Sequence, residues 1–346
     1  MHRRQFLRAA ALAGATGTFA GCGKRATWVV PEPGPSGPAP AGARAPEAAA
    51  PPLEAAPPPP GATTVVTVRS QQAVRDGLPN APAVVAMLDS AMAELTGKRD
   101  ARQAFGQLFR PDDVVAVKVN CIARASLSTS PVVCAAVVSA LKSAGVKPGN
   151  IIVYDRDRGE LDGAGFDIVT SGGPLCMSTD GKFGAPVSSG QYSGRLTALL
   201  DRATALINLP VLKHHTTTAV TMALKNHYGS IDNPSRYHRN LGVPGVAEVN
   251  SVPKIKQIQR LVVLDATRAC FDGGPTPPED QVVIESALMV ATDPVALDTV
   301  GFDLINRRRQ ERGQGPLPRP GWLDRAQQLG VGTADRSKIR AEEVRV

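Results

Sequence analysis

The sequence predicts an α/β protein with a mostly parallel sheet and helices on both faces, built as a single large domain or as two intimately packed lobes. Two observations predict this class. Short apolar segments alternate with longer segments of helical character through residues 63–346, and most of the short segments are rich in β-branched residues. This part of the chain is also long enough to bury one large hydrophobic core.

The individual elements follow from the same pattern. Predicted strands are Val65–Val68, Val114–Val119, Ile151–Tyr154, Ala205–Leu209, Leu261–Leu264 and Ala287–Val290. Predicted helices are Ala81–Leu95, Pro131–Ala144, Arg195–Ala203, Thr221–Tyr228, Pro294–Arg308 and Trp322–Leu329. Ser130-Pro131 and Asp293-Pro294 each combine a capping residue with proline at the first helical position. We expect the residues between Gly159 and Gly194, rich in Gly and Ser, to form an irregular excursion or a small antiparallel insert.

The N-terminus indicates export. Arg3 and Arg4 precede Phe6-Leu7 and a weakly apolar run, so residues 1–21 resemble a twin-arginine signal peptide. The run is too short and too weakly apolar for an ordinary transmembrane helix. The sequence therefore predicts the twin-arginine translocation machinery as a partner and a location on the periplasmic side.

A lipid anchor is predicted at the end of this signal. Phe19-Ala20-Gly21-Cys22 resembles a lipobox, in which Cys22 is lipid-modified and holds the protein at a membrane. The alternative is cleavage by ordinary signal peptidase with Cys22 incidental. Residues 22–62 follow as a Pro/Ala-rich linker, a composition that cannot bury a core and favours extended geometry. The predicted α/β domain then occupies residues 63–346.

Composition disfavours several function classes. The formal net charge of +8 is mild, and aromatic residues make up 4% of the chain, so we do not expect nucleic-acid binding. No Gly-rich dinucleotide fingerprint, phosphate-binding P-loop or Gly-x-Ser-x-Gly elbow is present. Cysteines beyond the signal have no CxxC spacing, which disfavours ferredoxin-type clusters and zinc ribbons. Their disulfide pairing stays open, and at least two are expected as buried free thiols; they are Cys121, Cys134, Cys176 and Cys270.

The stretch from Ala205 to Gly229 is the most informative part of the chain. Ala205–Leu209 is typical of a buried parallel strand, and Pro210 ends it. Ligands of open α/β sheets bind just beyond the carboxyl ends of strands. The polar residues expected there are Lys213, His214, His215, Lys225, Asn226 and His227. Imidazole and ammonium groups at this density suit an anionic substrate, a metal or proton transfer.

Polar groups also follow other predicted strands. Lys118 and Asn120 end one strand and face the same way, because side chains alternate along a strand. Asp265 closes another apolar strand and is either a helix or turn cap or a site carboxylate. We expect Lys118, Asn120, Lys213 and Asp265 to line one pocket, with a Lys at a sheet edge as the structural alternative for Lys118.

The segment after His215 has its own local prediction. Three consecutive Thr oppose a helix at residues 216–218, so we expect a loop there and an N-cap at Thr221. The free N–H groups of Ala223 and Leu224 would then point at an anion. His214 and His227 face either the site or solvent, and the polar loop around His238 favours a surface position.

These residues together resemble the family called "domain of unknown function 362". The pattern consists of Lys118-x-Asn120, Thr129-x-Pro131, Asn208-Leu209-Pro210-x-x-Lys213-x-His215, Thr221-x-x-x-Lys225-Asn226-x-x-Gly229, Asp265, Gly273-Gly274-Pro275 and Thr292-Asp293-Pro294-Val295-Ala296-x-Asp298. The resemblance covers about residues 112–305. Some members of the family are fused to ferredoxin modules, whose cysteines this chain lacks, and Val119 stands where many members have proline.

A more distant likeness concerns His215 and Lys225. Their spacing is similar to that of nickel-dependent lactate racemase, whose Lys carries a nickel-pincer nucleotide while histidines act as acid and base on a 2-hydroxy acid. By that likeness His238 would be a metal-side histidine. Residues 216–220 replace the glycine-rich loop of the racemase. On a continuous helix the two side chains would be about 15 Å apart along the axis, too far to share a metal.

Two function hypotheses follow. In the first, the protein is an exported enzyme with a Lys/His site for an anionic small molecule or organic cofactor, and His215 is the acid or base. In the second, it is a non-catalytic ligand- or cofactor-binding accessory protein of an exported redox system. Candidate catalytic residues are His215, Lys225 and Asp265. Candidate ligand-binding residues are Lys118, Asn120, Lys213, Thr221, Asn226 and Asp298.

Overall fold

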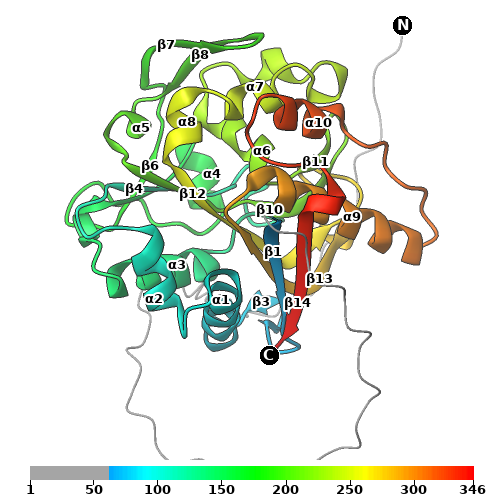
Figure 1. The fold of residues 1–346 in the computed structure, drawn as a ribbon, viewed down its shortest axis with the longest axis horizontal. Helices are drawn as coiled ribbons and strands as arrows, with labels where there is room; N and C mark the ends of the chain where they lie inside the picture. The colour runs from blue at the N-terminus through cyan, green and yellow to red at the C-terminus, as the bar shows by residue number, and fades with distance from the viewer. Residues whose placement is uncertain (1–61) are drawn as a thin grey trace, which may run out of the picture.

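The computed structural model describes residues 62–346, which form one ten-stranded sheet with helices on both faces and two short hairpins (Figure 1). Arg3, Arg4 and Cys22, with the predicted signal and nearly all of the predicted linker, lie outside the described residues. The strands are β1 Thr63–Arg69, β2 Val74–Arg75, β3 Leu78–Pro79, β4 Val115–Lys118, β5 Ile151–Asp155, β6 Leu175–Ser178, β7 Phe183–Ser189, β8 Tyr192–Thr197, β9 Ala205–Asn208, β10 Val211–His215, β11 Ala219–Thr221, β12 Gln259–Cys270, β13 Val282–Ala291 and β14 Ile339–Arg345.

The sheet is mostly parallel, as the sequence predicts. Its strand order is β14-β1-β13-β12-β9-β4-β5-β6, and β10 pairs with both β11 and β12. The strands from β12 through β6 are parallel to one another, as are β14 and β1. Only the pairs that β13 makes, and the pair between β10 and β11, are antiparallel within this sheet. The expected fold class is therefore confirmed.

Helices cover both faces of the sheet, and the alternation of side chains divides the core between them. Val115 and Val117 of β4 pack on the face covered by α1, α2 and α3, whereas Ala116 packs on the face covered by α6 to α10 (Figure 1). The helices are α1 Ala81–Thr96, α2 Ala101–Leu108, α3 Pro131–Ser143, α4 Arg158–Gly163, α5 Leu199–Arg202, α6 Ala223–Asn226, α7 Val246–Asn250, α8 Pro253–Ile258, α9 Pro294–Glu311 and α10 Gly321–Gln328.

Two predicted helices are wrong in extent. The segment expected as Arg195–Ala203 contains the end of β8 and only the short α5, because β8 pairs with β7 in an antiparallel hairpin. The segment expected as Thr221–Tyr228 begins in β11, continues as the four-residue α6 and ends in a 3₁₀ turn over His227–Ser230. The β7–β8 hairpin overlaps the region predicted as an irregular or antiparallel insert.

The strand before Pro210 ends there, but the chain does not leave the sheet. β10 resumes directly after this proline and pairs in parallel with the second half of β12, so that Val211 lies opposite Asp265. It then turns back as β11, with Lys213 opposite Thr221. This hairpin extends the sheet past the ends of β4, β5 and β9 and supplies one wall of the site described below.

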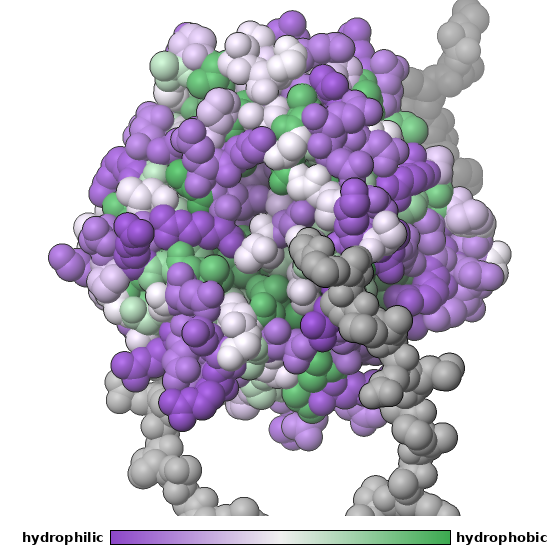
Figure 2. All heavy atoms as spheres, viewed as in Figure 1, coloured by the Kyte–Doolittle hydropathy of each residue, from purple (hydrophilic) through white to green (hydrophobic). Residues whose placement is uncertain are grey.

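The surface carries no large apolar area in the view of Figure 2, where hydrophobic residues form small groups among hydrophilic ones. No helix within residues 62–346 is long and apolar enough to cross a membrane. Cys121, Cys134, Cys176 and Cys270 are all buried free thiols, which answers the question of pairing that the sequence left open.

Candidate functional site

The site is built where three neighbouring parallel strands end together. Lys118 is the last residue of β4, and the strand register places it beside Asn208, the last residue of β9, and Tyr154 of β5. Asp155 is the last residue of β5. The carboxyl edge of the sheet thus presents an ammonium, an amide and a carboxylate side by side, at the place where α/β sheets bind ligands.

Lys118 and Asp155 form a buried ion pair at this edge. The Lys118 Nζ lies 2.7 Å from Asp155 Oδ1 and 2.6 Å from the carbonyl oxygen of Val119, and the lysine is 1% exposed. Asp155 Oδ2 accepts the backbone N–H of Cys121. A Cβ on Gly229 would lie 2.6 Å from both Lys118 Nζ and Asp155 Oδ1, so only glycine allows the chain to cross the pair this closely.

An amide network extends from this pair. Asn226 Oδ1 accepts from Lys118 Nζ at 3.2 Å and from Asn120 Nδ2 at 3.1 Å. Asn226 Nδ2 donates to Asn208 Oδ1 and to the carbonyl oxygen of Lys118. Asn208 Nδ2 in turn donates to the carbonyl oxygen of Ala223, which ties α6 to the end of β9. The network therefore holds both predicted asparagines in fixed orientations.

Lys225 is a buried cation without a carboxylate partner among residues 62–346. Its Nζ lies 3.1 Å from His238 Nε2 and 4.5 Å above the ring of Tyr228, and the residue is 7% exposed. His238 Nδ1 donates to the carbonyl oxygen of Pro234, so His238 Nε2 is the acceptor for the lysine. Burial, and then the charges of Lys213 and Arg156, lower the pKa of Lys225 to about 7.

His215 is held as a neutral imidazole. Its Nδ1 accepts the backbone N–H of Thr217 at 3.1 Å, which leaves the proton on Nε2. Burial lowers its pKa to about 2, and the charge of Lys225 acts in the same direction. The ring stacks on that of His238 with 5.6 Å between centroids. His215 thus offers a neutral N–H donor, since its Nε2 has no hydrogen-bond partner among residues 62–346.

These groups surround a pocket of about 240 Å³. Its walls include Arg156 and Glu160, which form their own ion pair beside Asp155. Two polar atoms of pocket residues are buried and have no hydrogen-bond partner among the described residues, namely Asn120 Oδ1 and Thr221 Oγ1. Unsatisfied buried polar atoms are rare in proteins, and here both belong to residues that line one cavity. The pocket is therefore suited to a polar ligand.

The structure brings six of the predicted site residues to this pocket: Lys118, Asn120, His215, Thr221, Lys225 and Asn226. It does not bring Lys213 or Asp265 there. Asp265 accepts the backbone N–H of Ser130 at the start of α3 and two bonds from Thr267, which is the capping alternative weighed from sequence. Lys213 is fully buried, and its Nζ donates to one acceptor among the described residues, the carbonyl oxygen of Leu127, at 3.3 Å. Burial lowers its pKa to about 8.

The anion that we expected at the N–H groups of Ala223 and Leu224 is the carboxylate of a protein side chain, Asp298. Thr221 belongs to β11 and does not cap α6. The N–H groups of Ala223 and Leu224 donate to the two oxygens of Asp298, at 2.8 and 2.9 Å. Asp298 is fully buried, and burial raises its pKa to about 7. Asp298 therefore positions α6 and takes the N–H groups of Ala223 and Leu224 that we expected to bind an external anion.

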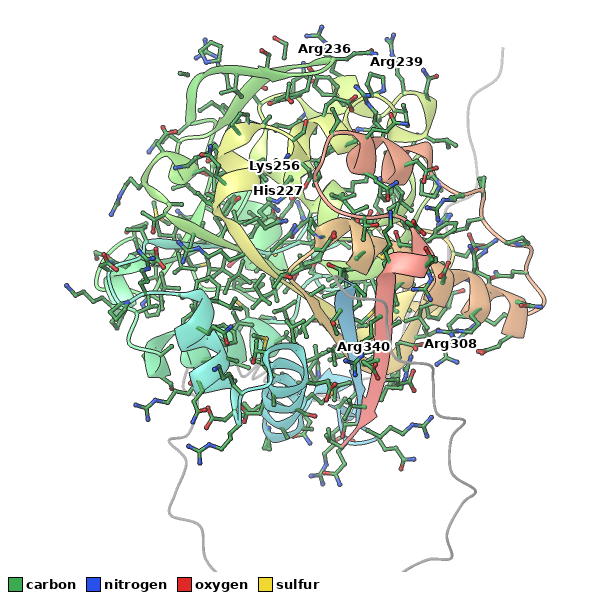
Figure 3. The ribbon with its side chains drawn as sticks, viewed as in Figure 1. His227, Arg236, Arg239, Lys256, Arg308 and Arg340 are labelled. Carbon is green, nitrogen blue, oxygen red and sulfur yellow. The ribbon has the colours of Figure 1, made fainter. Side chains whose placement is uncertain are left out.

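The other histidines lie in the interior rather than facing solvent. His214 is 7% exposed, and its Nδ1 accepts the N–H of Gly274. His227 lies inside the molecule near β12, whereas Arg236 and Arg239 lie at its periphery (Figure 3). The His227 ring bonds to Gln259 and Ser230, and burial lowers its pKa to about 4.

Sequence reasoning missed several pocket residues. Asp155 and Arg156 follow the predicted strand Ile151–Tyr154 in a polar run, which is typical of a solvated loop and has a site role as its alternative, and the sequence does not single out Glu160. Asp155 directly follows an apolar strand just as Asp265 does. His238, expected at the surface, lies half-buried against Lys225. The signal for Asp155 was present in its position after the strand. The likeness to the racemase singles out His238, whereas its local sequence predicts a surface loop, because tertiary packing returns this loop over α6 and brings His238 to Lys225.

The donor set does not match a metal centre. No group of three or more His, Cys, Asp or Glu side chains within residues 62–346 is arranged to hold a metal ion. His238, the expected metal-side histidine, uses both ring nitrogens for Lys225 and for the carbonyl oxygen of Pro234. The likeness to nickel-dependent lactate racemase therefore finds no metal-binding arrangement in this part of the chain.

Comparison with known families identifies the domain. The model of the family described as Domain of unknown function (DUF362) matches residues 115–303, more than half of the chain. The chain belongs to this family. Comparison with the curated proteins gave no match. The matched segment contains every residue of the pocket, from Lys118 in β4 to Pro275 after β12.

Two of the DUF362 motif residues have clear structural roles outside the pocket. Thr129 Oγ1 accepts the N–H of Asn120 and donates to the carbonyl oxygen of Leu209, which joins the ends of β4 and β9. A Cβ on Gly274 would lie 1.8 Å from the carbonyl oxygen of His214, so this position allows only glycine. Both residues hold the strands and loops that frame the site.

Proposed function

We propose that this DUF362 protein binds a small organic anion in the pocket at the carboxyl edge of its sheet, with Lys225 as the counter-ion. The observation that carries the proposal is the buried Lys225 ammonium, which has a neutral imidazole and an aromatic ring as neighbours and no carboxylate partner among the described residues. A buried charge is costly unless it is paired. A bound anion supplies the missing partner.

The carboxylates around the pocket are already engaged. Asp155 pairs with Lys118, and Glu160 pairs with Arg156. Lys225 is therefore the one cation lining the described pocket that has neither a carboxylate partner nor open solvent around it. His215 adds a neutral N–H donor to the same cavity. This balance favours a ligand with one or two negative charges and disfavours a cation.

We further propose that Lys225, rather than His215, exchanges protons if the site is catalytic. An acid or base works best when its pKa lies near the operating pH, and the pKa of Lys225 is about 7. His215, with a pKa near 2, stays neutral and serves as a hydrogen-bond donor. His238 Nε2 accepts from the lysine and would orient its amine toward the ligand.

Binding should depend on pH in a defined direction. An anion favours the charged ammonium, so it raises the pKa of Lys225 and its binding takes up a proton above pH 7. Affinity should fall up to about tenfold per pH unit between pH 7 and 9. Calorimetry with acetate, lactate, succinate and malate, in two buffers of different ionisation enthalpy at pH 8, measures both the affinity and the proton uptake.

Lys225→Met should abolish this binding, whereas Lys254→Met is a matched control. Lys254 is part-buried, donates to the carbonyl oxygen of Ala203 and does not line the pocket. Loss of binding in both variants, or retention in Lys225→Met, would contradict the assignment of the counter-ion.

The second hypothesis, a non-catalytic binding protein, is favoured by one observation. Among the described residues that line the pocket, no carboxylate is unpaired and the histidines are held neutral by burial, so only Lys225 is poised to exchange a proton there. Isotope exchange separates the two functions. An enzyme that abstracts protons should incorporate deuterium from the solvent into bound lactate or malate. A protein that only binds these acids should leave both of them unlabelled.

We also propose that the protein is exported and lipid-anchored, on the basis of Arg3, Arg4 and Cys22. Replacing both arginines by Lys should block export of the folded protein. Cys22→Ala should release the mature protein from membranes. Fractionation of cells that carry each variant tests both statements, and unchanged membrane association of the Cys22 variant would remove the anchor.

A further inference from the structure

The orientation of the pocket amides follows from hydrogen-bond chemistry. The Lys118 ammonium can only donate, so the oxygen of the Asn226 amide must face it, as the 3.2 Å contact shows. The Asn226 Nδ2 then faces two acceptors, Asn208 Oδ1 and the carbonyl oxygen of Lys118. Rotating the Asn226 amide by half a turn would place its NH₂ against an ammonium, so its orientation is fixed.

Asn226 fixes Asn120 in turn. Because Asn226 Oδ1 is an acceptor, it faces Asn120 Nδ2 at 3.1 Å, and a rotated Asn120 would bring two amide oxygens together. Asn120 Oδ1 is therefore held as an acceptor. It is buried, it has no hydrogen-bond partner among the described residues, and its residue lines the pocket. The hydroxyl of Thr221, in the same pocket, is also buried and unpartnered.

We propose that the ligand of this pocket is a small hydroxylated organic anion whose hydroxyl group donates to Asn120 Oδ1. This inference rests on the proposed anion site and names its substrate class. The anionic group pairs with Lys225, and the hydroxyl satisfies the acceptor that the amide network leaves open. Thr221 Oγ1 can donate or accept and completes the polar contacts. Unsubstituted carboxylates and inorganic anions without a donor leave Asn120 Oδ1 unpaired.

A hydroxyl fits this position better than an ammonium group does. Asn120 Nδ2 and Lys118 Nζ share the same acceptor, Asn226 Oδ1, so a ligand group that reaches Asn120 lies near the Lys118 ammonium. Arg156 and Lys225 line the same cavity. An ammonium group on the ligand would be repelled by these positive charges at short range in a partly buried site. Amino acids should therefore bind more weakly than the corresponding hydroxy acids.

The test compares matched anions that differ by one hydroxyl: lactate with propionate, glycolate with acetate, and malate with succinate. Alanine supplies the amino analogue. In the wild-type protein the hydroxylated member should bind at least about tenfold more tightly, because the other member leaves a buried acceptor unpaired. Asn120→Ala should reduce this preference to about threefold or less, while propionate binding changes little. Ser128→Ala is the control, since its buried hydroxyl is also unpartnered but does not line the pocket.

The outcomes separate this inference from the proposed function. Equal binding of both members of each pair by the wild-type protein would overturn the hydroxyl assignment and leave the anion site standing. Tighter binding of alanine than of lactate would overturn it as well. Absence of binding for every anion would overturn the anion site itself. The comparison of pairs needs no variant, so the inference stays testable even if Asn120→Ala folds poorly.

Discussion

Replacing Lys225 by Met should make the ligand-free protein more stable, the reverse of the usual effect of a substitution at a buried site. The ammonium of Lys225 is buried with no carboxylate partner in the described chain, so folding removes it from water without a negative charge to compensate. Met has a similar length and an apolar end. It should fill the same space beside the ring of Tyr228 without the cost of burying charge.

The magnitude follows from the pKa of Lys225. Burial, helped by Lys213 and Arg156, lowers it from 10.5 to about 7. Each pKa unit is about 1.4 kcal/mol, so burying the charged form costs roughly 4–5 kcal/mol below pH 7. Because the folded pKa lies below the unfolded one, the unfolded chain holds the extra proton between pH 7 and 10.5, and the penalty disappears across that window as pH rises. Losing the His238 bond and the Tyr228 contact costs about 1–2 kcal/mol.

The net gain in unfolding free energy should therefore be about 3 kcal/mol at pH 6 and should vanish or reverse near pH 10. Urea unfolding of wild-type protein and Lys225→Met at pH 6, 8 and 10, followed by circular dichroism, measures it. Other titrating groups are common to both proteins, so the difference isolates this lysine. A variant that is 3–5 kcal/mol less stable than wild type at pH 6 would show that Lys225 belongs to a buried ion pair and would refute the reasoning.

Three further predictions follow from the contacts around the site. Gly229→Ala should lower the free energy of unfolding by about 1–3 kcal/mol, measured in urea, because its Cβ would lie 2.6 Å from two side-chain atoms. Gly149→Ala is the control, since a Cβ there would have no neighbouring atom within 4 Å; an equal loss of stability in both variants would contradict the steric cause. Asp298→Ala should cost about 2–5 kcal/mol by leaving two buried N–H groups unpaired, and wild-type stability would refute its role. Lys213→Met should stabilise the protein by about 2 kcal/mol at pH 6, where the lysine is charged, with no gain at pH 10.5.

The sequence predicts the strands that contain a continuous apolar segment and misses strands that carry polar side chains, even where these are fully buried, as in β10. β4 reads as an apolar β-branched segment because both of its faces are covered by helices. β10 was not predicted, since we expected the strand to end at Pro210 and Lys213, His214 and His215 have no apolar pattern. They form a strand because the second half of β12 offers free backbone groups beside them. β14 is an edge strand with several exposed charged residues, so its sequence also lacks the apolar pattern that predicts a strand.

The candidate site was predictable where it depends on strand ends and unpredictable where it depends on loops. Lys118 and Asn120 follow a strand, and the rule for parallel sheets located them at the pocket. Asp265 satisfied the same rule but lies within the long β12, which continues past the edge where its neighbours end. Strand length is set by pairing with β13, a long-range contact that local sequence does not encode. The same limit applies to His238, which tertiary packing brings to Lys225.

The affinity for anions that we propose arises from which charged side chains are paired in the pocket, and not from the net charge of the chain. The pocket contains carboxylates as well as cations, and Asp155 and Glu160 are both neutralised by neighbours on the same wall. What remains among the described residues that line the pocket is one ammonium without a carboxylate partner, Lys225, which lies on the short α6 and contacts the loop that carries His238. A net charge of +8 over the whole chain could not reveal this, because the site that we propose depends on one residue, Lys225, that lacks a carboxylate partner among the described residues. The same reasoning applies to neutral groups, because the fixed orientation of Asn226 leaves Asn120 Oδ1 without a partner among the described residues, and we propose a ligand hydroxyl as that partner.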